Sequence, residues 1–253
     1  MKKNYLALVS LTSLTVASNA FAEEAASTSN FTPAQKEEIE KIIGEYISNH
    51  TDVVMDAVKA EGEKQKKEEA EKLQKAIIQH KEKIFKNPNV PVAGNPKGTK
   101  SLVIFADPYC GYCRKLHEEL PAVLESNNDL KVLFVDVPIM GYDSVTSIKA
   151  MIAANNQEKY VPLQKLILTS KDHLTHKKLV KKAKSLGMDV KKFETDCKSK
   201  ETQAQIDKTL ELVQEIGIHG TPVILVNETT VSSGYLPADQ LKEMLAVPVT
   251  PTE

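Results

Sequence analysis

The chain contains no tryptophan, and only 5% of its 253 residues are aromatic, so its core must be mainly aliphatic. Basic and acidic residues are nearly balanced, 33 against 34, and residues 1–22 contribute two of the lysines and no acid, so the rest carries a net charge of −3. This balance lacks the excess positive charge typical of proteins that bind nucleic acid. No apolar stretch is long enough to span a bilayer, which argues against an integral membrane protein.

Cysteine is scarce as well, and two of the three cysteines lie close together in Cys110-Gly111-Tyr112-Cys113. An apolar, strand-like run over residues 102–106 precedes this motif, and a helix-like run over residues 114–125 follows it. The start of a helix presents backbone N–H groups and a partial positive charge, which favour the thiolate form of the first cysteine. A strand, a Cys-x-x-Cys motif and a helix in this order are typical of a redox-active dithiol.

Two other interpretations of the motif stay open, a zinc site and a structural disulfide. A zinc site usually needs four protein ligands, and Cys197 is the only other thiol, so we expect no bound metal; we also expect no cofactor. A disulfide that closes a ring of four residues stabilises a fold little, because it removes little entropy from the unfolded chain. Cys197 shares a helical face with Val190 and Phe193, and we expect a buried, unreactive thiol rather than an intermolecular disulfide.

The first 22 residues have the pattern of a secretory signal peptide. A basic start, Lys2 and Lys3, is followed by an apolar stretch over residues 5–16 and by Ala20-Phe21-Ala22, a typical cleavage site. We expect cleavage after Ala22 and a soluble, exported product. The combination of this signal with a redox dithiol predicts the periplasm of a Gram-negative bacterium, where dithiol chemistry is used.

Two long helices are predicted after a small, polar leader at residues 23–30, which we expect to be disordered. The first begins at Thr32, where Pro33 suits the first helical position and Gln35 completes a capping box. The second runs from about residue 52 to residue 86. Its middle, residues 61–69, is almost wholly charged and cannot be buried along its length.

We therefore expect residues 31–88 to form a helical arm and stalk that joins copies of the chain. Apolar residues recur at helical spacing in residues 31–58, and two helices bury little surface by themselves, so a homo-oligomer would cover this apolar face. The pattern is too short and broken to distinguish a dimer from a trimer. The alternative is that the arm folds back onto the rest of the same chain.

Residues 89–253 show strands and helices in alternation. The predicted strands are residues 102–106, 130–137, 223–226 and 229–233. The sequence is helical in character from about residue 140 to residue 200, and further helices are predicted over residues 203–216 and 237–246. This order predicts an α/β protein with a mixed sheet covered by helices, namely a thioredoxin fold with an inserted helical subdomain.

A second chemical signal lies at Gly220-Thr221-Pro222, directly before a predicted strand. Proline cannot donate a hydrogen bond to a sheet, so it marks an edge or a turn. In thioredoxin-like folds this loop holds a cis-proline that faces the dithiol, so we expect a cis bond between Thr221 and Pro222, although cis bonds are uncommon overall. The loop would expose the backbone of Thr221 for pairing with an extended substrate chain.

With these motifs the chain resembles the DsbA-like thioredoxin-fold family. The resemblance covers about residues 85–246 and rests on Pro-Val-Ala-Gly-Asn-Pro at residues 91–96, the Cys-x-x-Cys after its strand, the helical insertion and Gly220-Thr221-Pro222. The N-terminal arm is similar to that of Com1-like and ScsC-like periplasmic members, which self-associate through it. The resemblance implies that Cys110 is the attacking cysteine, Cys113 the resolving cysteine and Pro222 the cis-proline.

Two features differ from the dedicated oxidases of that family. The pair Gly111-Tyr112, which tunes the motif, is unlike their Pro-His and is similar to the pair in periplasmic disulfide isomerases, where threonine also precedes the cis-proline. The strand position that often holds a buried acid is Ile104 here, and Asp107 is the nearest acidic substitute for a proton relay to Cys113. His117, one turn after Cys113, is expected to be solvated.

The resemblance implies thiol–disulfide exchange with exported client proteins that contain cysteines, together with a membrane redox partner that reduces or reoxidises the dithiol. We expect a homo-oligomeric protein disulfide isomerase with some oxidase capacity, because an oligomer places several dithiols around a shared cleft. The alternatives are a dithiol oxidase that donates disulfides to exported proteins, and a non-catalytic holdase or surface binding protein.

Overall fold

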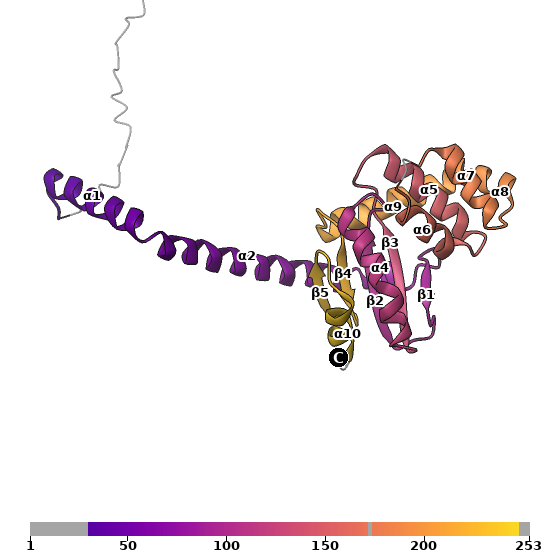
Figure 1. Cartoon of the computed structure of the whole chain (residues 1–253), viewed down its shortest axis with the longest axis horizontal. Coiled ribbons are helices and arrows are strands. Elements are labelled where there is room, and N and C mark those ends of the chain that lie inside the picture. The colour runs from indigo at the N-terminus through magenta and orange to yellow at the C-terminus, as the bar shows by residue number, and fades with distance from the viewer. Residues whose placement is uncertain (1–29, 172–173, 248–253) are drawn as a thin grey trace, which may run out of the picture. The chain divides into compact units, whose positions relative to one another are not determined.

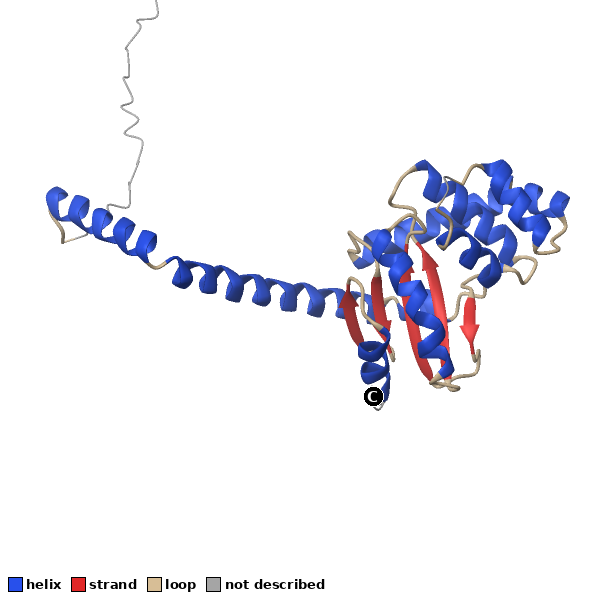
Figure 2. Ribbon diagram, in the orientation of Figure 1, coloured by secondary structure: helices blue, strands red, loops and turns tan. Residues whose placement is uncertain are grey.

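The computed structural model describes residues 30–171 and 174–247. The predicted signal peptide and residues 23–29 of the predicted leader lie outside the described residues. The chain divides after Val58 into two compact units, and Figures 1 and 2 show the elements of each. Among the residues described, no helix is both long enough and apolar enough to cross a lipid bilayer.

The first unit contains helix α1 (Pro33–Asn49) and the beginning of α2 (Thr51–Gln79). The predicted capping box of α1 is confirmed, because the Thr32 side chain accepts from the Gln35 backbone and the Gln35 side chain accepts from the Thr32 backbone. No side chain of α1 is buried. Its large exposed apolar residues, each between 47% and 56% exposed, are Ile42, Ile43, Tyr46 and Ile47.

The second helix is shorter than predicted, and this boundary was wrong. A single helix to residue 86 was expected, whereas α2 ends at Gln79 and a separate short helix, α3 (Lys81–Phe85), follows. The backbone of His80, with φ −101° and ψ 7°, leaves the helical conformation. No glycine or proline stands near His80, so the local sequence carries no signal for the break. Ile77 and Ile84, on either side of it, are both buried against the sheet.

Within the described residues, the sheet has five strands in the order β1-β3-β2-β4-β5. The strands are β1 (Val92–Gly94), β2 (Lys100–Ala106), β3 (Leu130–Asp136), β4 (Val223–Val226) and β5 (Thr230–Ser233). Only β2 and β3 pair in parallel, and the other pairs are antiparallel. The parallel register sets Ala106 opposite Asp136. The residues that follow β2 and β3 therefore lie together at the carboxyl end of these two strands.

Helices cover both faces of the sheet (Figure 1). They are α4 (Gly111–Glu125), α5 (Tyr142–Asn155), α6 (Tyr160–Leu168), α7 (His176–Ser185), α8 (Val190–Lys198), α9 (Lys200–Ile216) and α10 (Ala238–Ala246). Side chains alternate between the faces of a strand, so Leu102 and Ile104 pack with α4, whereas Val103 and Phe105 pack against α9 and the end of α2. Both cores are mainly aliphatic, as the lack of tryptophan requires.

The predicted fold class is confirmed: a thioredoxin-like fold with a mixed sheet, with the inserted helices α5 to α8 between β3 and α9. The Pro-Val-Ala-Gly-Asn-Pro segment supplies the edge strand β1. Gly94 has φ +78°, and a side chain there would clash with the carbonyl oxygen of Leu130 on the neighbouring strand. Glycine is therefore required at this position.

Candidate active site

The two motif cysteines lie at the start of α4, where β2 has just ended. Cys110 is the N-cap residue of α4, and its sulfur accepts a hydrogen bond from the Cys113 backbone N–H at 3.4 Å. Cys110 exposes 8% of its surface and Cys113 only 3%, and both are free thiols. An approaching reactant therefore meets the sulfur of Cys110 first.

The Thr221–Pro222 loop faces this dithiol. The Thr221–Pro222 peptide bond is cis, as the sequence predicted, and the Cys110 thiol donates to the Thr221 carbonyl oxygen at 3.3 Å. The two residues between the cysteines do not cover the dithiol. A Cβ atom added at Gly111 would have no neighbouring atom within 4 Å, and the Tyr112 side chain is 62% exposed. The structure thus brings together all six residues singled out from the two motifs.

The surroundings of the two thiols displace their pKa values in opposite directions. Burial opposes ionisation of Cys110, but hydrogen bonds from the side chains of Cys113 and Thr221 and from the backbone amides of Cys113 and Tyr112 hold its pKa below the ordinary value. Burial raises the pKa of Cys113 to about 12. Cys110 is therefore the more readily ionised of the two thiols, and the thiolate is the nucleophilic form of a cysteine.

Asp107, which the sequence suggested as the nearest substitute for a buried acid, serves as a hydrogen-bond acceptor for two loops. Its side chain is fully buried. The carboxylate accepts from the backbone N–H groups of Tyr109, Ile139 and Met140 and from the Ser144 hydroxyl, at 2.7 to 2.9 Å. Asp107 therefore ties the segment before Cys110 to the segment between β3 and α5.

Sequence reasoning missed a second acid, Asp136, at the end of β3. The hydroxyl of Tyr160 lies 2.9 and 3.0 Å from its two carboxylate oxygens. Burial raises the pKa of Asp136 to about 7, against the opposing effect of the Tyr160 hydrogen bond, and the negative charge of Asp107 raises it further. Its position opposite Ala106 follows from strand pairing, which no local pattern reveals.

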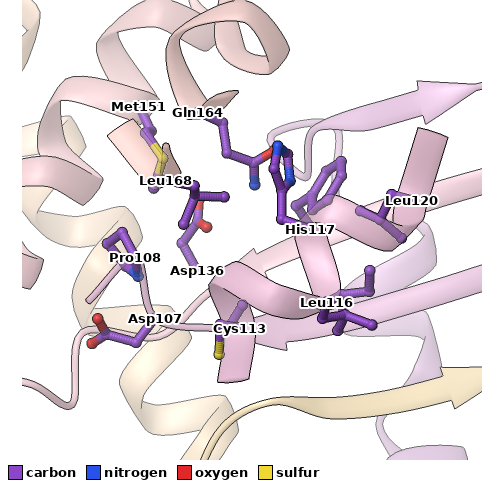
Figure 3. A pocket seen from close by; sticks show the side chains of 13 residues that line it. Asp107, Pro108, Cys113, Leu116, His117, Leu120, Asp136, Met151, Gln164 and Leu168 are labelled. Atoms are coloured by element: carbon purple, nitrogen blue, oxygen red, sulfur yellow. The ribbon is translucent and has the colours of Figure 1, made fainter. Parts of the chain in front are cut away.

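His117 was expected to be solvated, and the structure confirms this only in part, because the side chain is half-buried. It lines a cavity beneath Cys113 together with Asp136 and Gln164 (Figure 3). Its Nδ1 atom is buried and has no hydrogen-bond partner. Burial, with a smaller effect from the positive charge of Lys165, lowers the pKa of His117. The residue lies four positions after Cys113, so the α4 face that packs on the core carries both side chains inward.

Cys197 lies away from the motif and is buried, as predicted, with its sulfur 3.8 Å from the Lys149 carbonyl oxygen. Burial raises the pKa of Cys197 to about 12, which disfavours the thiolate, the reactive form. In the part of the chain that the structure describes, no three His, Cys, Asp or Glu side chains are grouped as metal ligands.

Comparison with known proteins gives one family match and several relatives of partial length. Residues 86–246 match a family model described as thioredoxin. A probable thiol:disulfide interchange protein DsbC from Bordetella pertussis is 26% identical over 148 residues, which cover 58% of this chain and 42% of the relative. The chain thus matches less than half the length of that relative.

Solved structures share the fold. A thioredoxin-like oxidoreductase from Silicibacter pomeroyi is 27% identical, with a TM-score of 0.61, covering 65% of this chain and 94% of that one. Alpha-DsbA2, a thiol-disulfide exchange protein from Wolbachia pipientis, is 24% identical with a TM-score of 0.63 and coverages of 68% and 94%. A linker-deletion variant of Proteus mirabilis ScsC is 19% identical with a TM-score of 0.62 and coverages of 87% and 97%. The last two similarities are those of fold alone.

Proposed function

The chain belongs to the thioredoxin family, and from this premise we propose that it is a thiol–disulfide oxidoreductase in which Cys110 attacks and Cys113 resolves. The observation that carries the proposal is the asymmetry of the dithiol. The sulfur of Cys110 caps α4 and lies 3.3 Å from the Thr221 carbonyl beside the cis-proline, whereas Cys113 is almost fully buried behind it. Such a thiol is suited to nucleophilic attack on a disulfide.

The reaction exchanges one S–S bond for another. The Cys110 thiolate attacks a client disulfide, forms a mixed disulfide with one client sulfur, and releases the other as a thiolate that takes up a proton. The client then either rearranges, which is isomerisation, or is released reduced when Cys113 attacks Cys110 and closes the disulfide. In the reverse direction a client thiolate attacks the Cys110–Cys113 disulfide and leaves oxidised.

The surface around Cys110 supports a polypeptide as the substrate. Tyr112 is 62% exposed, and the segment that Asp107 ties to the motif carries the exposed apolar residues Ile139, Met140 and Tyr142. Exposed apolar side chains next to a reactive group are typical of sites that bind unfolded chains. The backbone of Thr221 offers an extended client chain a partner for hydrogen bonds.

The direct test compares cysteine variants in the reactivation of scrambled ribonuclease. Cys110→Ser is expected to abolish reactivation, and Cys113→Ser to retain part of the isomerisation because a client can rearrange on Cys110 alone. The matched control is Cys197→Ala, which removes a thiol remote from the motif and is expected to leave the activity unchanged. Full activity of Cys110→Ser would refute the proposal and favour a binding protein that merely keeps the fold.

Isomerisation by a homo-oligomer is the more specific form of the proposal. Its support is the Gly111-Tyr112 pair, Thr221 before the cis-proline, and the exposed apolar residues on α1. Self-association through residues 31–58, as a dimer or a trimer, would remove those apolar side chains from water and place several dithiols around one client. Light scattering of the mature protein and of an Ile43→Asp, Ile47→Asp double variant tests this, and a monomer in both samples would contradict it.

The setting proposed for the reaction is the periplasm, supported by the signal-peptide pattern of residues 1–22. Exported proteins that contain cysteines would be the clients, and a membrane redox partner would reduce or reoxidise the dithiol. The alternative function is the donation of disulfides. Trapping the redox state of Cys110 and Cys113 in cells by alkylation distinguishes it from isomerisation. A mainly reduced Cys110–Cys113 pair supports isomerisation, and a mainly oxidised pair supports the oxidase.

A further inference from the structure

The inserted helices carry a strong excess of positive charge at α7 and α8. Residues 176–200 contain nine lysines and three acids, a net charge of +6 with histidine neutral, whereas residues 23–253 as a whole carry −3. The residues of 23–253 outside this segment therefore carry −9. The two helices lie side by side at the end of the insertion that is away from β5 and α10 (Figure 1).

The lysine cluster is defined here as the eight lysines of these two helices. All of them are exposed except Lys182, which is half-buried. The buried side chains of α7 and α8 point to the core instead, and they are Leu179, Ala183, Phe193 and Cys197. The members of the lysine cluster are Lys177, Lys178, Lys181, Lys182 and Lys184 on α7 and Lys191, Lys192 and Lys198 on α8.

The three acids of the segment are each engaged within it. Asp189 caps α8, where its side chain accepts from the Lys192 backbone N–H at 3.0 Å. Glu194 lies 3.6 Å from His176. Asp196 pairs with the Lys192 ammonium group at 2.6 Å. Three acids against nine lysines leave the positive charge of the segment in excess.

This arrangement does not serve the stability of the helices. Lys177 and Lys178 lie in the first turn of α7, and Lys191 and Lys192 in that of α8, and neither first turn contains an acid. The partial positive charge of a helix N-terminus disfavours cations there. Lys177 and Lys181 are four positions apart, and like charges at that spacing repel each other.

Solubility does not explain the lysine cluster either. The exposed helix α2 mixes six lysines with seven acids, and such a mixture of signs is sufficient to keep a surface in water. By contrast α7 has five lysines in ten residues and no acid. A cluster of one sign that weakens its own helices favours a negatively charged partner outside the chain.

The composition of the segment separates two kinds of anionic partner. Specific protein interfaces concentrate their binding energy in Trp, Tyr and Arg, and residues 176–200 contain none of these. Among the residues that the structure describes, the large exposed apolar side chains all lie outside α7 and α8. Lysine is a hydrated point charge and lacks the planar fork with which arginine holds one carboxylate or phosphate. The lysine cluster therefore suits a diffuse layer of negative charge.

We propose that the lysine cluster binds the surface of a lipid bilayer that is rich in anionic headgroups. The attraction is electrostatic and does not involve insertion, because α7 and α8 expose no large apolar side chain. Such binding is reversible and weakens as salt screens the charges. Neither helix contributes a residue to the dithiol or to the Thr221–Pro222 loop. The inference thus goes beyond the thiol–disulfide exchange proposed above and does not depend on it.

The test is flotation of the full-length mature protein with lipid vesicles. One set of vesicles contains equal parts of phosphatidylcholine and phosphatidylglycerol, and the other contains phosphatidylcholine alone. The protein is expected to float with the anionic vesicles at about 50 mM NaCl, to be released at about 500 mM NaCl, where the screening length is several-fold shorter, and to ignore the neutral vesicles.

A quadruple variant locates the binding surface. It combines Lys177→Gln, Lys181→Gln, Lys184→Gln and Lys191→Gln, four exposed positions at which glutamine is nearly as good a helix former as lysine. Each lysine near an anionic surface strengthens binding about five-fold. We therefore expect the variant to bind the anionic vesicles at least about 25-fold more weakly, which is the effect of two such lysines.

The matched control removes the same charge from exposed positions of α2, where lysines alternate with acids. It is expected to bind the anionic vesicles as the wild type does. Its four substitutions are Lys66→Gln, Lys67→Gln, Lys72→Gln and Lys75→Gln.

The outcomes are distinct. Wild-type protein that does not float with anionic vesicles, that floats equally with neutral ones, or that stays bound at high salt would overturn the proposal, and so would wild-type binding by the folded quadruple variant. If circular dichroism shows that this variant does not fold, the double variant Lys181→Gln, Lys191→Gln decides: weaker binding supports the proposal and unchanged binding overturns it. Retention on immobilised polyglutamate without binding to vesicles would also overturn it, in favour of an acidic protein partner. Reactivation of scrambled ribonuclease without vesicles reports on the proposed activity separately, and the quadruple variant is expected to retain it.

Discussion

Replacing Asp107 with alanine is predicted to cost a large part of the stability of the domain. The carboxylate is fully buried and accepts four hydrogen bonds from two segments that are far apart in the sequence. Three of the donors are backbone N–H groups, which cannot turn towards another acceptor without moving the chain. The Ser144 hydroxyl can rotate and is the one donor free to find a new partner.

The magnitude follows from those donors. A hydrogen bond to a charged group contributes about 1.5–3 kcal/mol, and a buried donor left unpaired costs about 1–3 kcal/mol. Because such contributions are not additive, we expect Asp107→Ala to lower the free energy of unfolding by about 3–5 kcal/mol, the usual range for breaking a buried charged network. Asp107→Asn keeps one oxygen acceptor in place and is expected to lose less.

Urea unfolding followed by far-ultraviolet circular dichroism measures the loss. Asp129→Ala is the matched control, because Asp129 also accepts from a backbone N–H, that of Thr99, at 3.0 Å, but lies at the surface; a small change is expected there. The rate of Cys110 alkylation by iodoacetamide gives a second readout. The Cys110 N–H donates to the Asp107 backbone oxygen at 3.1 Å, so a displacement of the backbone at residue 107 would also displace Cys110. A wild-type unfolding midpoint for Asp107→Ala would refute the argument that this carboxylate holds the two segments together.

Three other variants test the dithiol, the raised pKa of Asp136 and the packing of the inserted helices. Cys113→Ser is expected to accumulate the mixed disulfide between Cys110 and a client, visible on non-reducing gels, and its absence would speak against Cys110 as the attacking thiol. Because the folded-state pKa of Asp136, about 7, lies above its ordinary value, this group makes the fold less stable as pH rises from about 4 to about 7. Urea unfolding at pH 5 and pH 8 should therefore show a smaller loss of stability with pH in Asp136→Asn than in the wild type, and an equal loss in both would contradict the raised pKa. Phe193→Ala removes a fully buried ring and is expected to cost about 3–5 kcal/mol, checked by the same unfolding measurement; a cost below about 1 kcal/mol would show that the helices around it repack.

The chemistry of the motif was predictable because it is local. Cys110, Cys113 and the helix start between them lie within four residues, and the polarity of a helix terminus acts over that distance. The capping box of α1 and the main strands were predictable for the same reason. The cis bond before Pro222 required one further step, since the approach of the Thr221–Pro222 loop to the dithiol was expected from the resemblance and not from spacing in the sequence.

The positions of Asp136 and His117 around the cavity beneath Cys113 were not predictable in this way. Asp136 lies 23 positions after Cys113 and reaches the cavity only because β3 pairs in parallel with β2 and sets Asp136 opposite Ala106. His117, one turn after Cys113, was expected to be solvated, yet it is half-buried and lines the cavity with Asp136. The break at His80 likewise has no local signal and accompanies the burial of Ile77 and Ile84 against the sheet.

The amino-acid sequence alone predicted the dithiol at the start of a helix, the order of strands and helices, and the capping box that begins α1, because each of these depends on residues close along the chain. Tertiary structure alone decided which acid and which histidine share the space behind the second sulfur. That choice depends on the pairing of β2 with β3 and on the packing of α4 against the sheet, and both arise only when distant segments pack together.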